Sequence, residues 1–143
     1  MLSQYRWQVV LFTAVLAAAI FILCPNYLKI QRAPDVDRFR RGVDTYGATR
    51  VRWAARLDLA FAASYAMLGA TFSGCGSLAV IGALAVAFAA LSDEAENILV
   101  LAGISRRELL NISGIRKMRS FGLLKSAGLA FGVALIAFGC IRG

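Results

Sequence analysis

Long apolar runs divide the chain into four segments. Apolar residues dominate residues 7–28, 53–72, 78–104 and 120–141. A helix needs about 20 mostly apolar residues to cross a hydrocarbon core of about 30 Å, and each run has roughly that length or more. The pattern therefore predicts an all-α polytopic membrane protein. We expect a single transmembrane domain over residues 1–143, built as a four-transmembrane-helix bundle.

The first run raises the question of a cleaved leader. Ala17, Ala18 and Ala19 mimic a signal-peptidase site, but the apolar run continues to Leu23 and is too long for a typical leader core. We therefore expect an uncleaved helix. The second and third runs are separated only by residues 73–77, which predicts a helical hairpin.

Each of the two longer connections carries an apolar stripe at helical spacing. The stripes are Val36, Phe39, Val43 and Tyr46 in the first connection and Leu109, Ile112, Ile115 and Met118 in the second. Pro34 followed by Asp35 is a helix-start signal, and Ser105 and Glu108 have the spacing of a capping box. We expect a short amphipathic interfacial helix in each connection. A solvated loop is the alternative for the first.

Charge gives these segments an orientation. The net charge is +8, and the two longer connections hold fourteen of the sixteen Lys and Arg residues when Arg56 and Lys125, near the ends of the adjoining runs, are counted with them. The positive-inside rule places both connections in the cytoplasm and both termini outside it. With 59% hydrophobic residues, the basic charge indicates anionic membrane lipid rather than nucleic acid. The candidate lipid-headgroup residues are Arg38, Arg40, Arg41, Arg106, Arg107, Arg116, Lys117 and Arg119.

The third run contains an unusual acidic stretch. Asp93, Glu96 and Asn97 share a helical face, whereas Glu94 points elsewhere. Ionised side chains are rare and costly inside a membrane, so these groups should be shallow, paired or shielded from lipid. The orientation places them level with charged residues on the neighbouring helices. The candidate intramembrane polar cluster comprises Asp58, Asp93, Glu94, Glu96, Asn97, Arg56 and Lys125.

Four interpretations of this cluster remain open. Its acids could pair with Arg56 or Lys125 and fix the bundle. A hard divalent cation such as Mg²⁺ could bind the oxygen donors of Asp58, Asp93, Glu96 and Asn97. The carboxylates could also relay protons or cations, or form a docking face for the basic helix of a partner.

Cysteine and histidine usage narrows the chemistry. The chain has no histidine, which excludes histidine-dependent triads and haem ligation by histidine. Cys24, Cys75 and Cys140 show no CxxC spacing, so we expect neither a zinc site nor any other metal held by cysteine. Buried free thiols are the favoured interpretation. A disulfide is the alternative, on the expectation that all three lie on the same side.

Asp58 on the second helix and the Asp93-x-x-Glu96-Asn97 motif on the third resemble a pattern in uncharacterised small bacterial four-helix integral membrane proteins. The resemblance covers helices two and three and implies the fold but no activity. The chain also lacks the aspartate-rich signatures of CDP-alcohol phosphotransferases and prenyltransferases, which favours a protein that is not an enzyme.

Together these features predict a small non-catalytic protein of the bacterial inner (plasma) membrane. It would be an accessory or structural subunit of a larger membrane complex, or a homo-oligomer, with a basic cytoplasmic face. The first alternative is a metal-dependent enzyme acting on a lipid-linked phosphate at the cytoplasmic interface. The second is a small proton or cation transporter.

Overall fold

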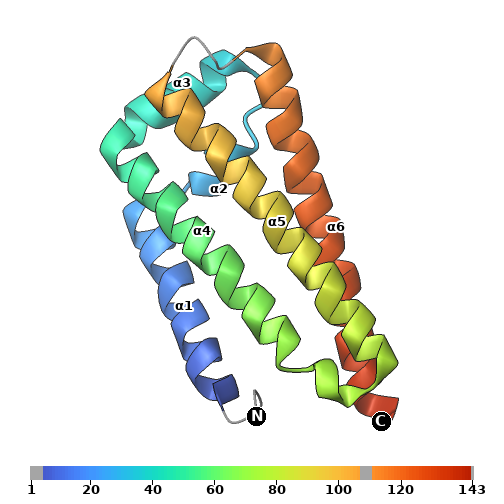
Figure 1. Cartoon of the computed structure of the whole chain (residues 1–143). Coiled ribbons are helices and arrows are strands. Elements are labelled where there is room, and N and C mark those ends of the chain that lie inside the picture. The colour runs from blue at the N-terminus through green and yellow to red at the C-terminus, as the bar shows by residue number, and fades with distance from the viewer. Residues whose placement is uncertain (1–4, 107–110, 143) are drawn as a thin grey trace.

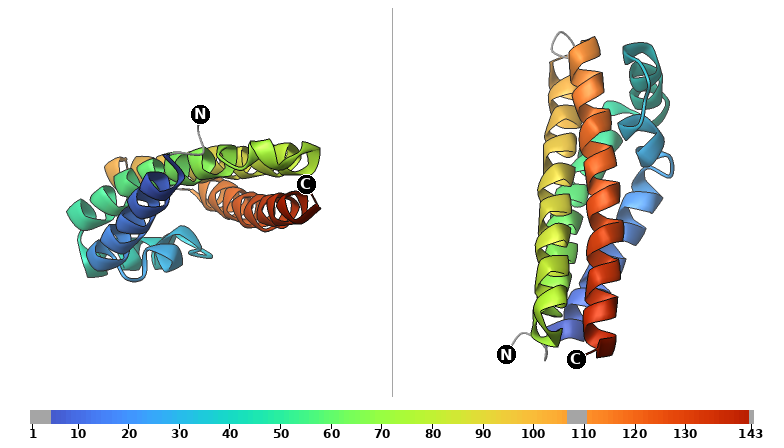
Figure 2. Two further views of the ribbon diagram at one scale, coloured as in Figure 1. Left: turned by 90° about the horizontal axis from the view of Figure 1, so that it is seen from below. Right: turned by 90° about the vertical axis from the view of Figure 1, so that its right-hand side faces the viewer.

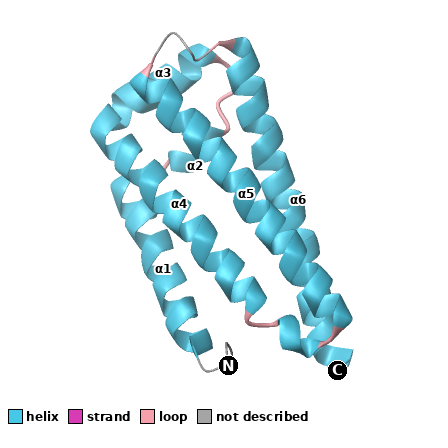
Figure 3. Cartoon of the chain, viewed as in Figure 1, coloured by secondary structure: helices cyan, strands magenta, loops and turns pink. Residues whose placement is uncertain are grey.

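Helices account for nearly all of the computed structural model, which describes residues 5–106 and 111–142 (Figure 1). No strand occurs within those two ranges (Figure 3), and the all-α prediction is confirmed. The elements in chain order are α1 (Arg6–Leu23), α2 (Tyr27–Gln31), α3 (Val36–Tyr46), α4 (Ala48–Ala70), the 3₁₀ helix η2 (Ser73–Cys75), α5 (Ser77–Ser105) and α6 (Ile112–Arg142).

The long helices form an elongated bundle. Helices α4, α5 and α6 follow one another along the chain, and each runs antiparallel to the one before it (Figures 1 and 2). Helix α1 packs along α4. The start of α1 and the end of α6 lie at one end, which we call the terminal end (Figure 1). Helix α3, the end of α5 and the start of α6 lie at the opposite end, which we call the basic end because most of the arginines are there.

Among the residues that the structure describes, three helices, α1, α5 and α6, are long and apolar enough to cross a membrane. The expectation of a membrane protein is confirmed to this extent. The fourth expected span, residues 53–72, corresponds to α4, which ends at Ala70 and is not among the three. This helix begins at Ala48 rather than Trp53 and therefore includes Arg50 and Arg52. Gly47 has a φ of 81°, which ends α3 and lets α4 start at the next residue.

The first connection contains two helices rather than one. The predicted helix α3 is confirmed: Asp35 caps it by accepting a hydrogen bond of 2.7 Å from the backbone N–H of Arg38. Helix α2 was not predicted. The first apolar helix ends at Leu23 instead of residue 28, because Pro25 cannot continue the helical hydrogen bonding. The chain then turns and α2 folds back against the bundle.

In the described part of the second connection, the predicted interfacial helix is not a separate helix but the first part of α6, so the prediction of a separate helix is wrong. Helix α6 runs without a break from Ile112 through residue 120 to its end. Ile115 and Met118 are buried as its continuous inner face, and Asn111 accepts a 2.9 Å hydrogen bond from the N–H of Gly114. Glu108 of the expected capping box and Leu109 lie outside the described residues.

Small residues let α5 and α6 approach closely. A Cβ atom added at Gly82 would lie 2.6 Å from the carbonyl oxygen of Gly132, and one added at Gly132 would lie 2.7 Å from the carbonyl oxygen of Gly82. The GxxxG pair of Gly128 and Gly132 therefore packs within the chain. At the basic end, a second group of buried apolar residues joins α2, α3, α4, α5 and α6.

The cysteines differ from expectation. Cys75 and Cys140 form a disulfide that ties η2 to the end of α6 at the terminal end, so the prediction of three free thiols is wrong for these two. Cys24 is free and buried. It follows α1 and packs among the core residues of the basic end, so the expectation that all three cysteines share one side is also wrong.

The disulfide offers a test of orientation. Disulfides persist in oxidising compartments and are rare in the cytosol. We expect a membrane-impermeant maleimide to label Cys75 and Cys140 in intact cells only after treatment with an impermeant reductant. Gel-shift detection in a Cys24→Ala background would measure this. Labelling of Cys75 solely after the cytoplasmic side is opened would contradict the predicted orientation.

Candidate functional site

A buried polar cluster links helices α4, α5 and α6. It brings together Asp58 from α4, Asp93, Glu96 and Asn97 from α5, and Lys125 from α6. The exposed fraction is 7% for Asp58 and at most 1% for the three α5 residues. The i, i+3 and i+4 spacing of these three puts them on one side of α5, as expected.

Lys125 supplies the cation of the cluster. Its Nζ donates a hydrogen bond of 2.7 Å to Oδ1 of Asp93 and lies 3.4 Å from Oε2 of Glu96. Helix α6 passes close enough for this because Gly122 has no side chain, and a Cβ there would meet Oε1 of Glu96 at 3.0 Å. The lysine therefore bridges two carboxylates of α5.

Asn97 is the centre of the hydrogen bonding. Its Nδ2 donates to Oδ2 of Asp58 at 3.0 Å and to Oδ1 of Asp93 at 3.1 Å. Its Oδ1 accepts from the Tyr27 hydroxyl at 2.6 Å and from Nε2 of Gln31 at 3.1 Å. One side-chain amide thus connects α2, α4 and α5, and a buried hydrogen-bond network of this kind favours a single arrangement of the helices.

Three members of this cluster were missed by sequence reasoning. Gln31 also donates to Oδ2 of Asp58 at 3.0 Å, and the Tyr65 hydroxyl donates to Oδ2 of Asp93 at 3.2 Å. Tyr27 is the third, through the hydrogen bond that it donates to Asn97. Burial raises the pKa of its phenol, which keeps the hydroxyl a donor. The polar side chain of Gln31 was a visible hint of a further cluster member in the sequence. Its place in the cluster could not be predicted, because it depends on α2 folding back against the bundle.

Two expected members lie outside the cluster. Arg56 is exposed, and its guanidinium lies 5.2 Å from the centroid of the Trp53 ring. Glu94 is half-buried and makes none of the hydrogen bonds described above. Arg56 is two positions before Asp58 on the helix, so its side chain points away from the face that carries the carboxylate.

The arrangement does not suit a metal ion. Within residues 5–106 and 111–142, no group of three Asp, Glu or Cys residues is placed to hold one. The proposed ligand set of Asp58, Asp93, Glu96 and Asn97 does come together, but nitrogen donors from Asn97, Gln31 and Lys125 occupy the carboxylates. A Mg²⁺ ion needs oxygen ligands in a near-ideal octahedron.

A cavity adjoins the cluster on the side of α6, and we call it the Glu96 cavity. Its volume is about 430 Å³. It is lined by Arg32, Glu96, Arg119, Gly122, Leu123 and Ser126. Glu96 reaches both the cavity and Lys125, and its Oε2 accepts no hydrogen bond from the described residues.

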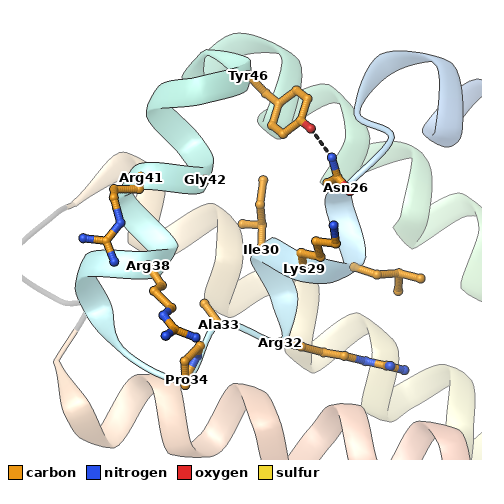
Figure 4. Close-up of a pocket in the computed structure, with 11 residues that line it drawn as sticks. Asn26, Lys29, Ile30, Arg32, Ala33, Pro34, Arg38, Arg41, Gly42 and Tyr46 are labelled. Atoms are coloured by element: carbon orange, nitrogen blue, oxygen red, sulfur yellow. Dashed lines mark hydrogen bonds between the residues drawn. The ribbon is translucent and has the colours of Figure 1, made fainter.

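A second cavity, of about 550 Å³, lies between α2 and α3 (Figure 4). Lys29, Arg32, Arg38 and Arg41 contribute to its lining. Figure 4 shows that Arg32 and Arg41 extend in opposite directions, so these cations do not converge on one point. Asn26 donates a hydrogen bond to the Tyr46 hydroxyl across one side. This surface suits diffuse contact with anions better than one chelated phosphate.

The candidate headgroup residues are solvent-facing. Among those that the structure describes, every side chain is exposed: Arg38, Arg40, Arg41, Arg106, Arg116, Lys117 and Arg119. They belong to α3 and to the residues around the α5–α6 connection, all at the basic end (Figure 1). Arg107 lies outside the described residues.

Comparison with known proteins adds no assignment. No family model matches the chain, and no curated protein or solved structure is detectably similar to it.

Proposed function

We propose that the chain is a non-catalytic membrane protein that serves as an accessory or structural subunit and contacts anionic lipid or an acidic partner through its basic end. The observation that carries this proposal is the separation of its polar groups. The buried ones form contacts within the chain, centred on Asn97 and Lys125. The exposed cations gather at one end of the bundle.

Connectivity supports four crossings with the basic end in the cytoplasm. Helix α1 starts at the terminal end, and α5 starts at the same end (Figure 1). If both cross the membrane, α4 must cross back between them, and burial of Asp58 against α5 removes its charge from contact with lipid. The positive-inside rule and the disulfide at the terminal end favour the same orientation.

The outer face of α1 supports an apolar environment beside the bundle. Helix α1 has a single buried residue, Leu16. Its large apolar side chains at Trp7, Leu11, Phe21 and Ile22 are each at least 67% exposed. Such a surface needs lipid or another membrane helix to cover it, as a subunit of a complex would have.

Partner capture in mild detergent tests the proposal. We expect the tagged chain to copurify with one protein, or a few, in near-stoichiometric amounts, measured by quantitative mass spectrometry. Reversing the charges of Arg38, Arg40 and Arg41 to Glu should abolish this, because like charges oppose an acidic partner. Arg142→Glu at the terminal end is the matched control and should retain the partner. A monodisperse wild-type chain that recovers no partner would contradict the subunit role.

A further inference from the structure

We propose that the Glu96 cavity binds a phosphate ester that also carries a primary ammonium group, such as the phosphoethanolamine headgroup of a membrane lipid. The cavity combines charges of both signs. Its lining includes two basic residues, Arg32 and Arg119, and one acidic residue, Glu96. A ligand with an anionic and a cationic group matches this lining better than an anion alone, which would meet the carboxylate.

The unfilled position is on Glu96. The glutamate is 1% exposed, yet its Oε2 accepts no hydrogen bond from the described residues. Lys125 directs its close contact of 2.7 Å to Asp93 and lies 3.4 Å from Oε2 of Glu96. Buried carboxylate oxygens normally have donors. Lys125 thus pairs with Oε2 by charge without a hydrogen bond, and a ligand ammonium in the adjoining cavity would add the hydrogen bond that Oε2 lacks.

The phosphate position follows from guanidinium chemistry. Arg119 is exposed and lines the cavity at the basic end, and Arg32 lines it from the loop after α2. Arginine binds phosphate oxygens with two parallel hydrogen bonds. The lining contacts on α6, from Arg119 through Gly122 and Leu123 to Ser126, recur at helical spacing, so the cavity extends along one face of that helix.

The size and the edge of the cavity fit a lipid headgroup. A volume of about 430 Å³ falls in the usual range for small-molecule sites. Leu123 lines the cavity and is 72% exposed, so an acyl chain leaving the headgroup would have an apolar surface to follow. A primary ammonium can donate three hydrogen bonds to its surroundings, whereas a trimethylammonium can donate none.

Native mass spectrometry of the full chain in detergent tests the proposal with three short-chain lipids. We expect dioctanoyl phosphatidylethanolamine to bind roughly tenfold more tightly than the phosphatidylcholine and phosphatidylglycerol analogues, since each lacks one charge-assisted contact. Glycerophosphoethanolamine, which has no acyl chains, separates the two sources of this chemistry. If glycerophosphoethanolamine displaces phosphatidylethanolamine at equal concentration, the ligand is a soluble phosphate ester. If it competes more weakly, the ligand is a lipid. Both outcomes agree with the proposal.

Two variants and a control locate the site. Arg119→Gln should weaken phosphatidylethanolamine binding by roughly tenfold, whereas Lys117→Gln, exposed on the same helix and outside the cavity, should leave it unchanged. Glu96→Gln should remove the preference for ethanolamine over choline. If Glu96→Gln does not fold, the comparison of headgroups on the wild type still decides.

Equal binding of the three lipids, tightest binding of phosphatidylglycerol, or unchanged binding by Arg119→Gln would each overturn the proposal. Loss of thermal stability in Arg119→Gln without lipid would do so as well, because it would mean that Arg119 itself partners Glu96. The site does not require a protein partner, so headgroup selectivity and partner capture can fail independently.

Discussion

Replacing Lys125 with methionine should destabilise the bundle by about 3–5 kcal/mol, because it leaves a buried carboxylate without its cation. Lys125 is the charged donor to Asp93, at 2.7 Å, and lies 3.4 Å from Glu96. Methionine has a similar length and keeps the packing. The expected result is a lower midpoint in thermal or denaturant unfolding of the purified protein.

The design of the comparison isolates the charge. Lys117→Met removes an exposed lysine from the same helix and should change stability by less than about 0.5 kcal/mol. Adding Asp93→Asn and Glu96→Gln to Lys125→Met should restore part of the loss, because the two carboxylates that Lys125 contacted are then neutral amides. Equal effects of Lys125→Met and Lys117→Met would show that the ion pair does not hold the bundle together.

The helices of this protein were largely predictable, and the reason is physical. Apolar runs long enough to cross a membrane leave the backbone few alternatives to helix, so the runs that became α5 and α6 are visible in the sequence. Asp35 as a helix cap was equally readable, since a capping side chain acts within three residues of its own position. Errors of a few residues arose at helix ends, where Pro25 and Gly47 redirected the chain.

The candidate site was predictable only in part. Helical spacing put Asp93, Glu96 and Asn97 on one face of their helix. The predicted orientation of the helices in the membrane placed Asp58 and Lys125 at the same depth as these residues. The side of the helix on which a residue lies was predicted less well. Arg56 is near Asp58 in sequence, but its side chain is exposed. The contributions of Tyr27 and Gln31 depend on α2 folding back against α4 and α5, which is a tertiary contact without a local sequence signal.

The disulfide was only the alternative in the sequence analysis, and its two cysteines were not singled out, for a related reason. Cys75 and Cys140 are 65 residues apart, and their meeting depends on α5 and α6 lying antiparallel along their full length. That alignment in turn depends on the close approach of the two helices. The glycines that permit the approach are therefore the second place where one substitution should have a large effect.

Replacing Gly132 with valine should cost about 3 kcal/mol and leave the oligomeric state unchanged. A Cβ at this position would lie 2.7 Å from the Gly82 carbonyl oxygen and 3.0 Å from the backbone N of Val86. Since backbone atoms cannot rotate away, α6 must move outward and the packing along α5 is lost. Ala130→Val introduces the same side chain at an exposed position of α6 and serves as the control.

The same experiment decides between two roles of the GxxxG pair. Because Gly128 and Gly132 pack against α5 of their own chain, the valine should lower the unfolding midpoint of the protein in detergent while light scattering reports the same mass as for the wild type. A GxxxG seam between two chains would behave in the opposite way. The variant would then dissociate into smaller species and keep the unfolding midpoint of each chain, and the close contact of α5 with α6 would not be what holds this bundle together.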